Sequence, residues 1–323
     1  MKKTVIFLIL SAVVIICFTA CSSQNGAGNA TPDAADHTAA NAEISENAAD
    51  NTAVDRDDTE SDESDENADN ATTTAASVPD RDTLFQVSLL QGLTFGDYHG
   101  SITVGELKRK GDTGLGTFDA LNGELIMLDG TVYRAAGDGT VEAVPDDETI
   151  PFADVTFFDT DDTQTIENIP DYDALRELLN QKVAEMGGNR FYIIHIDGDF
   201  GEMNVRSEYQ QEEPYRTLAE ALEYDQTFYD YENITGTVVG LYCPPYMDRL
   251  NATGWHLHFI SEDRTQGGHV LGLSVVMAQL SFDITDGFQM LLPETDMFAG
   301  FDLTVDQSED IEKVETNVSR DDA

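Results

Sequence analysis

The chain contains few basic residues. It has 17 Lys and Arg against 62 Asp and Glu, so its formal net charge is -45 at pH 7. A chain of this charge repels nucleic acid and anionic lipid headgroups. We therefore exclude nucleic acid as a partner. The acidic clusters at 146–148 and 159–162 lack the spacing of a calcium-binding loop, and we interpret them as solvated surface.

Cysteine is also scarce, with three residues in 323. Cys17 and Cys21 lie in the amino-terminal segment, so only Cys243 is left for the folded part and no disulfide is expected within it. Cys243 precedes two prolines, and no basic partner that could activate its thiol is evident in the sequence. We expect a structural role for it.

Residues 1–21 resemble a lipoprotein-type export signal. Lys2 and Lys3 precede an apolar run from Val5 to Ile16 that is short for a membrane span, and small residues stand before Cys21. We expect Cys21 to carry a lipid that anchors the protein to the membrane on the extracytoplasmic side. Secretion after cleavage nearby is the alternative.

Residues 22–82 contain almost no aromatic or branched aliphatic side chains. Such a segment cannot bury enough apolar surface to order itself, and its acidic runs repel one another. The composition predicts an acidic, disordered tether. Residues 83–323 remain as the folded part, long enough for one large domain or for two small ones that share a core.

Within residues 83–323 the pattern is strand-rich. Asn122-Gly123 and Asp129-Gly130 predict hairpin turns, and strands are expected at 151–158, 190–196, 235–242, 255–260 and 270–277. The clearest helix is expected at 171–186, where apolar residues recur at intervals of three and four before Gly187. The fold class is therefore α+β with few helices.

Three of the six histidines lie within one short stretch, GWHLHFISEDRTQGGHV. His256 and His258 are two residues apart in an expected strand, so both side chains project from the same face. A turn built on the Gly267-Gly268 pair would bring His269 back beside them. Three imidazoles without a nearby cysteine are typical of catalytic zinc, which keeps one position open.

Taken together, GLGTFDALNGELIMLDGTVYR, FYIIHIDGDFGEMNVRSEYQQEEPY and the histidine stretch resemble the alpha-acetolactate decarboxylase family. The resemblance implies a zinc enzyme that converts 2-acetolactate to acetoin and carbon dioxide. It also implies two packed sheets in a catalytic domain at 83–323, and a homodimer. Export and the tether are not features that the resemblance implies.

The resemblance also implies particular site residues. The zinc ligands fall on His256, His258 and His269, an essential glutamate on Glu124, and an arginine on Arg206. A carboxylate near the carboxyl terminus falls on Glu315, with Glu312 as the alternative.

Two other readings stay open at the level of sequence. In a cupin-like oxygenase or isomerase, Glu262 would bind the metal together with His256 and His258, and His269 would have no role. Alternatively, the chain is a surface lipoprotein that binds zinc or a small ligand without catalysis.

Overall fold

A computed structural model describes residues 80–315, apart from the side chains of residues 308, 309, 312 and 313. The expected export signal with Cys21, and the expected tether up to residue 79, lie outside the described residues. Near the start of the described residues, the chain already contacts the folded unit. The Arg81 guanidinium donates a hydrogen bond to the carbonyl oxygen of Phe158 (2.6 Å). No helix within 80–315 is long and apolar enough to cross a membrane.

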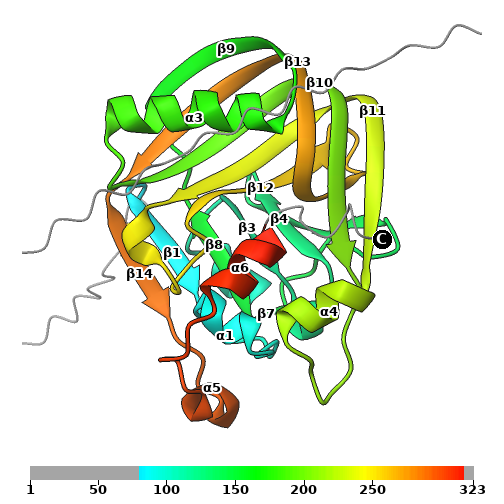
Figure 1. Cartoon of the computed structure of the whole chain (residues 1–323), viewed down its shortest axis with the longest axis vertical. Helices are drawn as coiled ribbons and strands as arrows, with labels where there is room; N and C mark the ends of the chain where they lie inside the picture. Colours follow the sequence, from blue (N-terminus) through cyan, green and yellow to red (C-terminus); the bar gives the residue numbers. More distant parts are fainter. Residues whose placement is uncertain (1–79, 316–323) are drawn as a thin grey trace, which may run out of the picture. The chain divides into compact units, whose positions relative to one another are not determined.

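Most strands belong to two sheets (Figure 1). The first has the order β14, β1, β8, β3, β4, β5, β6, and all its neighbours are antiparallel except β1 and β14. Its strands are β1 (Thr83–Val87), β3 (Thr113–Thr117), β4 (Glu124–Leu128), β5 (Thr131–Ala135), β6 (Val141–Ala143), β8 (Phe152–Thr156) and β14 (Gly287–Leu291). Two short strands, β2 (Ile102–Thr103) and β7 (Thr149–Ile150), pair separately.

The second sheet curls until two of its strands meet. Its strands are β9 (Asp162–Ile169), β10 (Phe191–Glu208), β11 (Gln226–Cys243), β12 (Gly254–Ser261) and β13 (Gly267–Thr285). β10 pairs with β11 on one side and with β13 on the other, while β12 lies between β11 and β13. Four strands therefore close into a ring around an apolar cluster that includes Phe200, Phe259 and Leu273.

The two sheets pack against each other through apolar side chains. Leu115 on β3 packs with Ile193 and Leu241 of the second sheet. Ile126 on β4 packs with Val239 and Ile260. The expected strand-rich α+β fold with two packed sheets and few helices is confirmed.

Helix α3 (Tyr172–Met186) covers the second sheet (Figure 1). The Asp171 side chain caps it by accepting from the backbone N–H of Ala174, and the chain leaves it at Gly187 with φ 116°. Leu175, Leu179 and Val183 form its buried face. The helix expected at 171–186 is thus confirmed.

The remaining helices are short. They are α1 (Leu90–Thr94), α2 (Val104–Leu107), α4 (Leu218–Tyr224), α5 (Asp296–Gly300) and α6 (Ser308–Glu315), with 3-10 turns η1 (Asp119–Leu121) and η2 (Pro245–Met247). α1, α4 and α6 come from distant parts of the chain and share one apolar cluster. Figure 1 shows α6 beside the strands of the first sheet.

The structure differs from the expectations mainly in strand length. The runs expected at 190–196, 235–242 and 270–277 are parts of β10, β11 and β13, which have 18, 18 and 19 residues. The additional parts of β10 and β11 include exposed acidic residues, such as Asp199 and Glu232, which interrupt the apolar pattern. β9 was not expected, because Ile166 is its one fully buried residue.

The glycine pair at 267–268 lies in β13 and not in the turn, contrary to expectation. Gly268 has φ 147°, and a Cβ atom there would stand 2.5 Å from the carbonyl oxygen of Arg206. The glycine therefore allows β13 to approach β10 closely at that point.

Candidate active site

The three histidines meet at the short pairing between β12 and β13. His258 lies directly opposite His269, and His256 precedes His258 by two residues on the same face. The Nε2 atom of His256 is 3.1 Å from Nε2 of His258 and 3.1 Å from Nδ1 of His269. All three rings are buried. The hairpin expected to carry His269 back beside the pair is present.

The surroundings keep these imidazoles neutral. Burial, together with the charge of Arg206, lowers the pKa of His256 to about 3. Burial also holds the pKa of His258 and of His269 well below the usual range. The Nδ1–H of His258 donates to the carbonyl oxygen of Leu125 (2.7 Å), which leaves its Nε2 lone pair free. A neutral ring with a free lone pair is the form that binds a metal.

These nitrogens suit a divalent metal ion. Bonds of about 2.0–2.1 Å to a tetrahedral zinc place two ligand nitrogens about 3.3 Å apart, close to the 3.1 Å that separates Nε2 of His256 from a nitrogen of His258 and of His269. All three nitrogens lie within 4.8 Å of one another. Among the described residues, His256, His258 and His269 form the group of side chains placed to hold such an ion. No cysteine takes part in it, which fits an open site better than a closed structural one.

Glu124 approaches the histidines from the first sheet. It is the first residue of β4 and follows Gly123, whose φ is 86°. Its Oε2 atom lies 3.3 Å from Nε2 of His258. Burial raises the pKa of Glu124 well above the usual range, and the negative charge of Glu208 raises it further. The buried surroundings of Glu124 therefore favour the protonated, uncharged form of its carboxyl group.

Arg206 enters the site from β10. It lies opposite His269, so Arg206, His269 and His258 occupy one rung across three strands and face the same way. Its Nη2 atom donates to the carbonyl oxygen of Val314 (2.8 Å). Its Nε atom is buried and has no hydrogen-bond partner within the described residues. A buried donor without a partner is suited to an acidic ligand.

Glu315 enters the site from the end of α6. Its Oε2 atom is 3.7 Å from Nε2 of His256 and accepts no hydrogen bond from the described residues. Burial raises the pKa of Glu315 to about 7. For the alternative Glu312, the backbone lies in α6 but the side chain is outside the described residues.

Sequence reasoning missed Glu208. It follows Arg206 by two residues on β10, so its side chain lies on the same face, and this spacing was the available signal. The Thr117 hydroxyl donates to its Oε1 atom (3.2 Å). Burial raises the pKa of Glu208, which hydrogen bonds to Glu124. The two carboxyl groups therefore form one buried pair.

Other candidates do not join the site. Glu262 is exposed in the turn after β12, so the cupin-like arrangement is wrong. His195 is buried, stacks on Phe158 with ring centroids 3.9 Å apart, and hydrogen bonds to Thr113 (3.2 Å). Burial raises the pKa of the Cys243 thiol, so this residue stays an uncharged part of the core.

One small cavity, of about 40 Å³, gathers most of these groups. Glu124, Arg206, Glu208, His256, His269 and Glu315 line it on the polar side, and leucines of α1 and α4 line it on the apolar side. Titratable groups buried together around a cavity, with shifted pKa values, mark an active site. The fold and this site define an enzyme whose histidines are able to hold a metal ion.

Known proteins share both the sequence and the fold. A family model for alpha-acetolactate decarboxylase matches residues 84–305. The alpha-acetolactate decarboxylase of Methanosarcina mazei is 41% identical over 234 residues, which cover 72% of this chain and 80% of the relative. That of Brevibacillus brevis is 37% identical over 230 residues, covering 71% and 80%.

A crystal structure of alpha-acetolactate decarboxylase from Bacillus subtilis strain 168 superposes with a TM-score of 0.70 at 34% identity, over 72% of this chain and 99% of that one. The chain belongs to the alpha-acetolactate decarboxylase family and is a carboxy-lyase. Glu315 lies beyond the last residue that the family model matches.

Proposed function

We propose that the protein converts 2-acetolactate to acetoin and carbon dioxide, with a zinc ion held by His256, His258 and His269. One observation carries this proposal. Nε2 of His256 lies 3.1 Å from a nitrogen of His258 and of His269, and His256 and His269 line one cavity with a buried guanidinium and with carboxyl groups whose pKa values are raised. The family's name supplies the substrate.

Arg206 binds and orients the substrate. Acetolactate carries a carboxylate, and the Nε–H of Arg206 is a buried donor without a partner. A guanidinium presents its donors in a fixed fork, so it fixes the direction of the carboxylate and of the bond that breaks. Because Nη2 is already bonded to Val314, the guanidinium is held in place before the substrate arrives.

Breaking that bond releases carbon dioxide and leaves its electron pair on the substrate as an enediolate. When bound, zinc supplies a Lewis acid that stabilises negative charge on the neighbouring oxygens by several kcal/mol. The histidines supply only neutral nitrogens, so the positive charge of the ion is not cancelled by its ligands.

Glu124 then supplies the proton that turns the enediolate into acetoin. It lies 3.3 Å from His258, and its burial beside Glu208 favours the protonated carboxyl group that can give up a proton. Glu208 shares a hydrogen bond with Glu124 and can hold a second proton. Glu315, beside His256, is a further carboxyl group whose proton lies close to the site.

Purified full-length protein tests the proposal directly. We expect about one zinc ion per chain by metal analysis and formation of acetoin from 2-acetolactate in a colour assay. Glu124→Gln should retain zinc and lose most of its turnover, because the amide cannot release a proton. Zinc-loaded protein that produces no acetoin would contradict the proposal, and would leave a binding protein without catalysis.

A further inference from the structure

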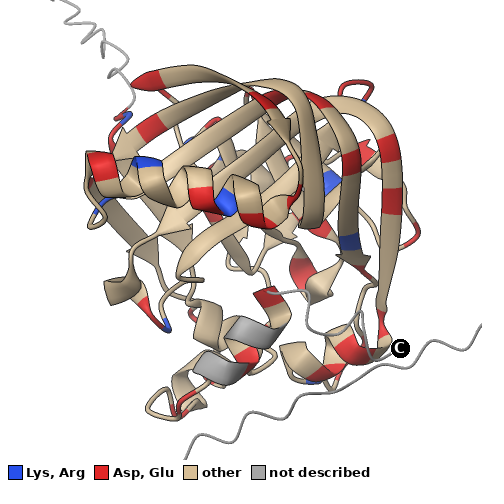
Figure 2. Ribbon diagram, turned by 45° about the horizontal axis from the view of Figure 1, so that its top comes forward, with Lys and Arg blue, Asp and Glu red and all other residues tan. Residues whose placement is uncertain are grey.

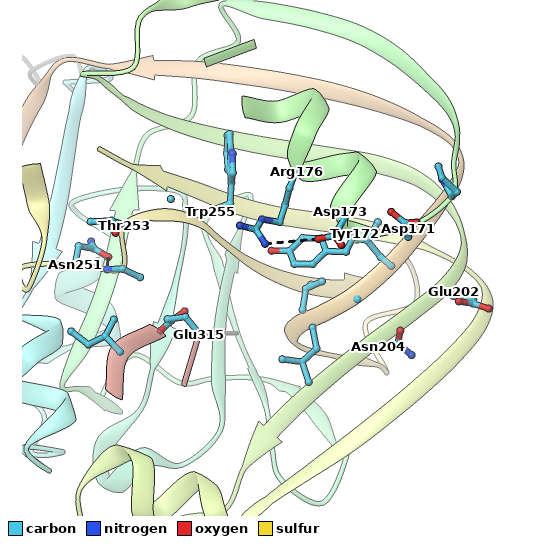
Figure 3. Close-up of a pocket in the computed structure, with 18 of the residues that line it drawn as sticks. Asp171, Tyr172, Asp173, Arg176, Glu202, Asn204, Asn251, Thr253, Trp255 and Glu315 are labelled. Atoms are coloured by element: carbon cyan, nitrogen blue, oxygen red, sulfur yellow. Dashed lines mark hydrogen bonds and ion pairs between the residues drawn. The ribbon is translucent and has the colours of Figure 1, made fainter. Parts of the chain in front are cut away.

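A second, larger cavity lies where β12 and β13 separate. The two strands pair only from His258 to Ile260 and from Gly267 to His269. Before His258 and after His269 they diverge, and a cavity of about 680 Å³ lies between Trp255 and residues 270–273. The amino-terminal end of α3 forms its opposite wall (Figure 3).

This large cavity adjoins the active site. Glu315 is a lining residue of both cavities. The active-site cavity, at about 40 Å³, holds roughly three water molecules at about 10–15 Å³ each, so the substrate needs adjoining space. The apolar side chains of Trp255 and Leu271 offer a surface for the substrate's methyl groups.

All but one of the charged residues that line the large cavity are acidic and would repel an anionic substrate. Its walls carry Asp171, Asp173, Glu202, Asp248 and Glu315. Arg176 is the one basic residue among the residues that line it. Figure 2 shows how sparsely Lys and Arg are distributed over the described part of the chain.

The guanidinium of Arg176 has no close ionic partner among the described residues, so its charge can act on a ligand. Its guanidinium lies 4.0 Å from the carboxylate of Asp173, at the limit of an ion pair, and 5.8 Å from the centre of the Tyr172 ring. Its side chain is 48% exposed. Figure 3 shows Arg176 beside Tyr172 on the wall formed by α3. An ion pair that is both long and exposed is weak, so a carboxylate can compete for the guanidinium.

We propose that this large cavity is the route by which the anionic keto acid reaches the active site, and that Arg176 attracts its carboxylate at the mouth. The inference rests on the proposed function. Arg176 acts on the approach of the substrate and not on the reacting bond. Its removal should therefore change kcat/KM and leave kcat nearly unchanged.

Arg176→Gln in the full-length protein tests this route. At low ionic strength we expect kcat/KM for 2-acetolactate to fall roughly threefold to tenfold, the range for one attractive charge close to a solvated ligand. The difference from wild type should shrink as salt screens the charge. Arg176→Lys should retain most of the activity, and Asp173→Asn should raise kcat/KM.

Arg190 offers a matched control. Its side chain is 49% exposed and pairs with Asp286 (3.3 Å), but it does not line the large cavity. Arg190→Gln makes the same change in net charge and should behave as wild type. An equal loss in both glutamine variants, or wild-type kcat/KM in Arg176→Gln at low salt, would overturn the route.

Two other outcomes are distinguishable. A loss that salt does not alter, and that Arg176→Lys shares, would overturn the role of charge and make Arg176 a structural residue of α3. A wild-type protein that forms no acetoin would overturn the proposed function itself.

Discussion

Replacing Arg206 by lysine separates charge from geometry in the active site. Arg206 uses Nη2 to hold the carbonyl oxygen of Val314 at 2.8 Å, and its Nε atom remains free for a substrate carboxylate. Lysine keeps the positive charge but carries its donors on one nitrogen. Its three N–H groups radiate from one point, so an ammonium cannot reach the Val314 carbonyl and the carboxylate at the two separate positions that Nη2 and Nε occupy.

Loss of one hydrogen bond to a charged group costs about 1.5–3 kcal/mol. This corresponds to a fall in kcat/KM of about tenfold to a hundredfold. If Arg206 aligns the bond that breaks, kcat should fall together with the affinity for substrate. The measurements are kcat and KM from acetoin formation, zinc content by metal analysis, and the midpoint of thermal unfolding.

Arg134→Lys is the matched control. The Arg134 side chain is 12% exposed, pairs with Glu142 and Glu148, and lies over the ring of Phe118, away from the active-site cavity. We expect this variant to lose stability and keep wild-type kinetics. Wild-type kcat/KM in Arg206→Lys would refute the assignment. A defect confined to KM would mean that Arg206 binds substrate and transition state equally.

Three further changes test other parts of the molecule. His269→Ala should empty the zinc site and abolish acetoin formation, while His195→Ala should keep the metal; full zinc occupancy without His269 would contradict the ligand set. Burial raises the pKa of Asp154 from 3.8 to about 7. The folded state therefore binds this proton more tightly than the unfolded state does. The stability that the protonated group contributes is present below about pH 4 and is lost as pH rises through about 7. Asp154→Asn should therefore match wild type near pH 4 and unfold at a higher temperature at pH 8, as calorimetry at the two pH values would show. Deletion of residues 22–79 should leave the unfolding midpoint and turnover unchanged, because that composition cannot build a core; a large loss of stability would show that the segment packs on the folded unit.

Local sequence patterns predicted those parts of the fold whose structure is set locally. Asp171, the apolar stripe of α3 and Gly187 specify one helix without help from the rest of the chain. The Asp129-Gly130 turn between β4 and β5 has positive φ angles of 50° and 73° at both residues, as its composition predicts. The closure of β10 against β13 could not be predicted in this way, because it depends on pairing between residues far apart in sequence.

The active-site residues likewise fall into those that a local sequence pattern predicts and those that it does not. His256, His258 and His269 lie on one hairpin, so strand periodicity together with the expected turn predicts their meeting. Glu124, Arg206 and Glu315 come from three other elements, and only the family resemblance pointed to them. Glu208 was overlooked because a glutamate near the end of a strand usually faces solvent. Here helices α1 and α4 help to cover its cavity.

The rung that joins Arg206, His269 and His258 limits how the connection between β12 and β13 can change in evolution. A slip of one residue in β13 would turn His269 toward the apolar interior and bring Val270 to the cavity face. Insertions at 262–266 are therefore tolerable only as outward loops that leave the pairing intact. The length of this turn can vary among descendants of the chain. The alternation that decides which residues of β13 face the histidine side of the sheet cannot.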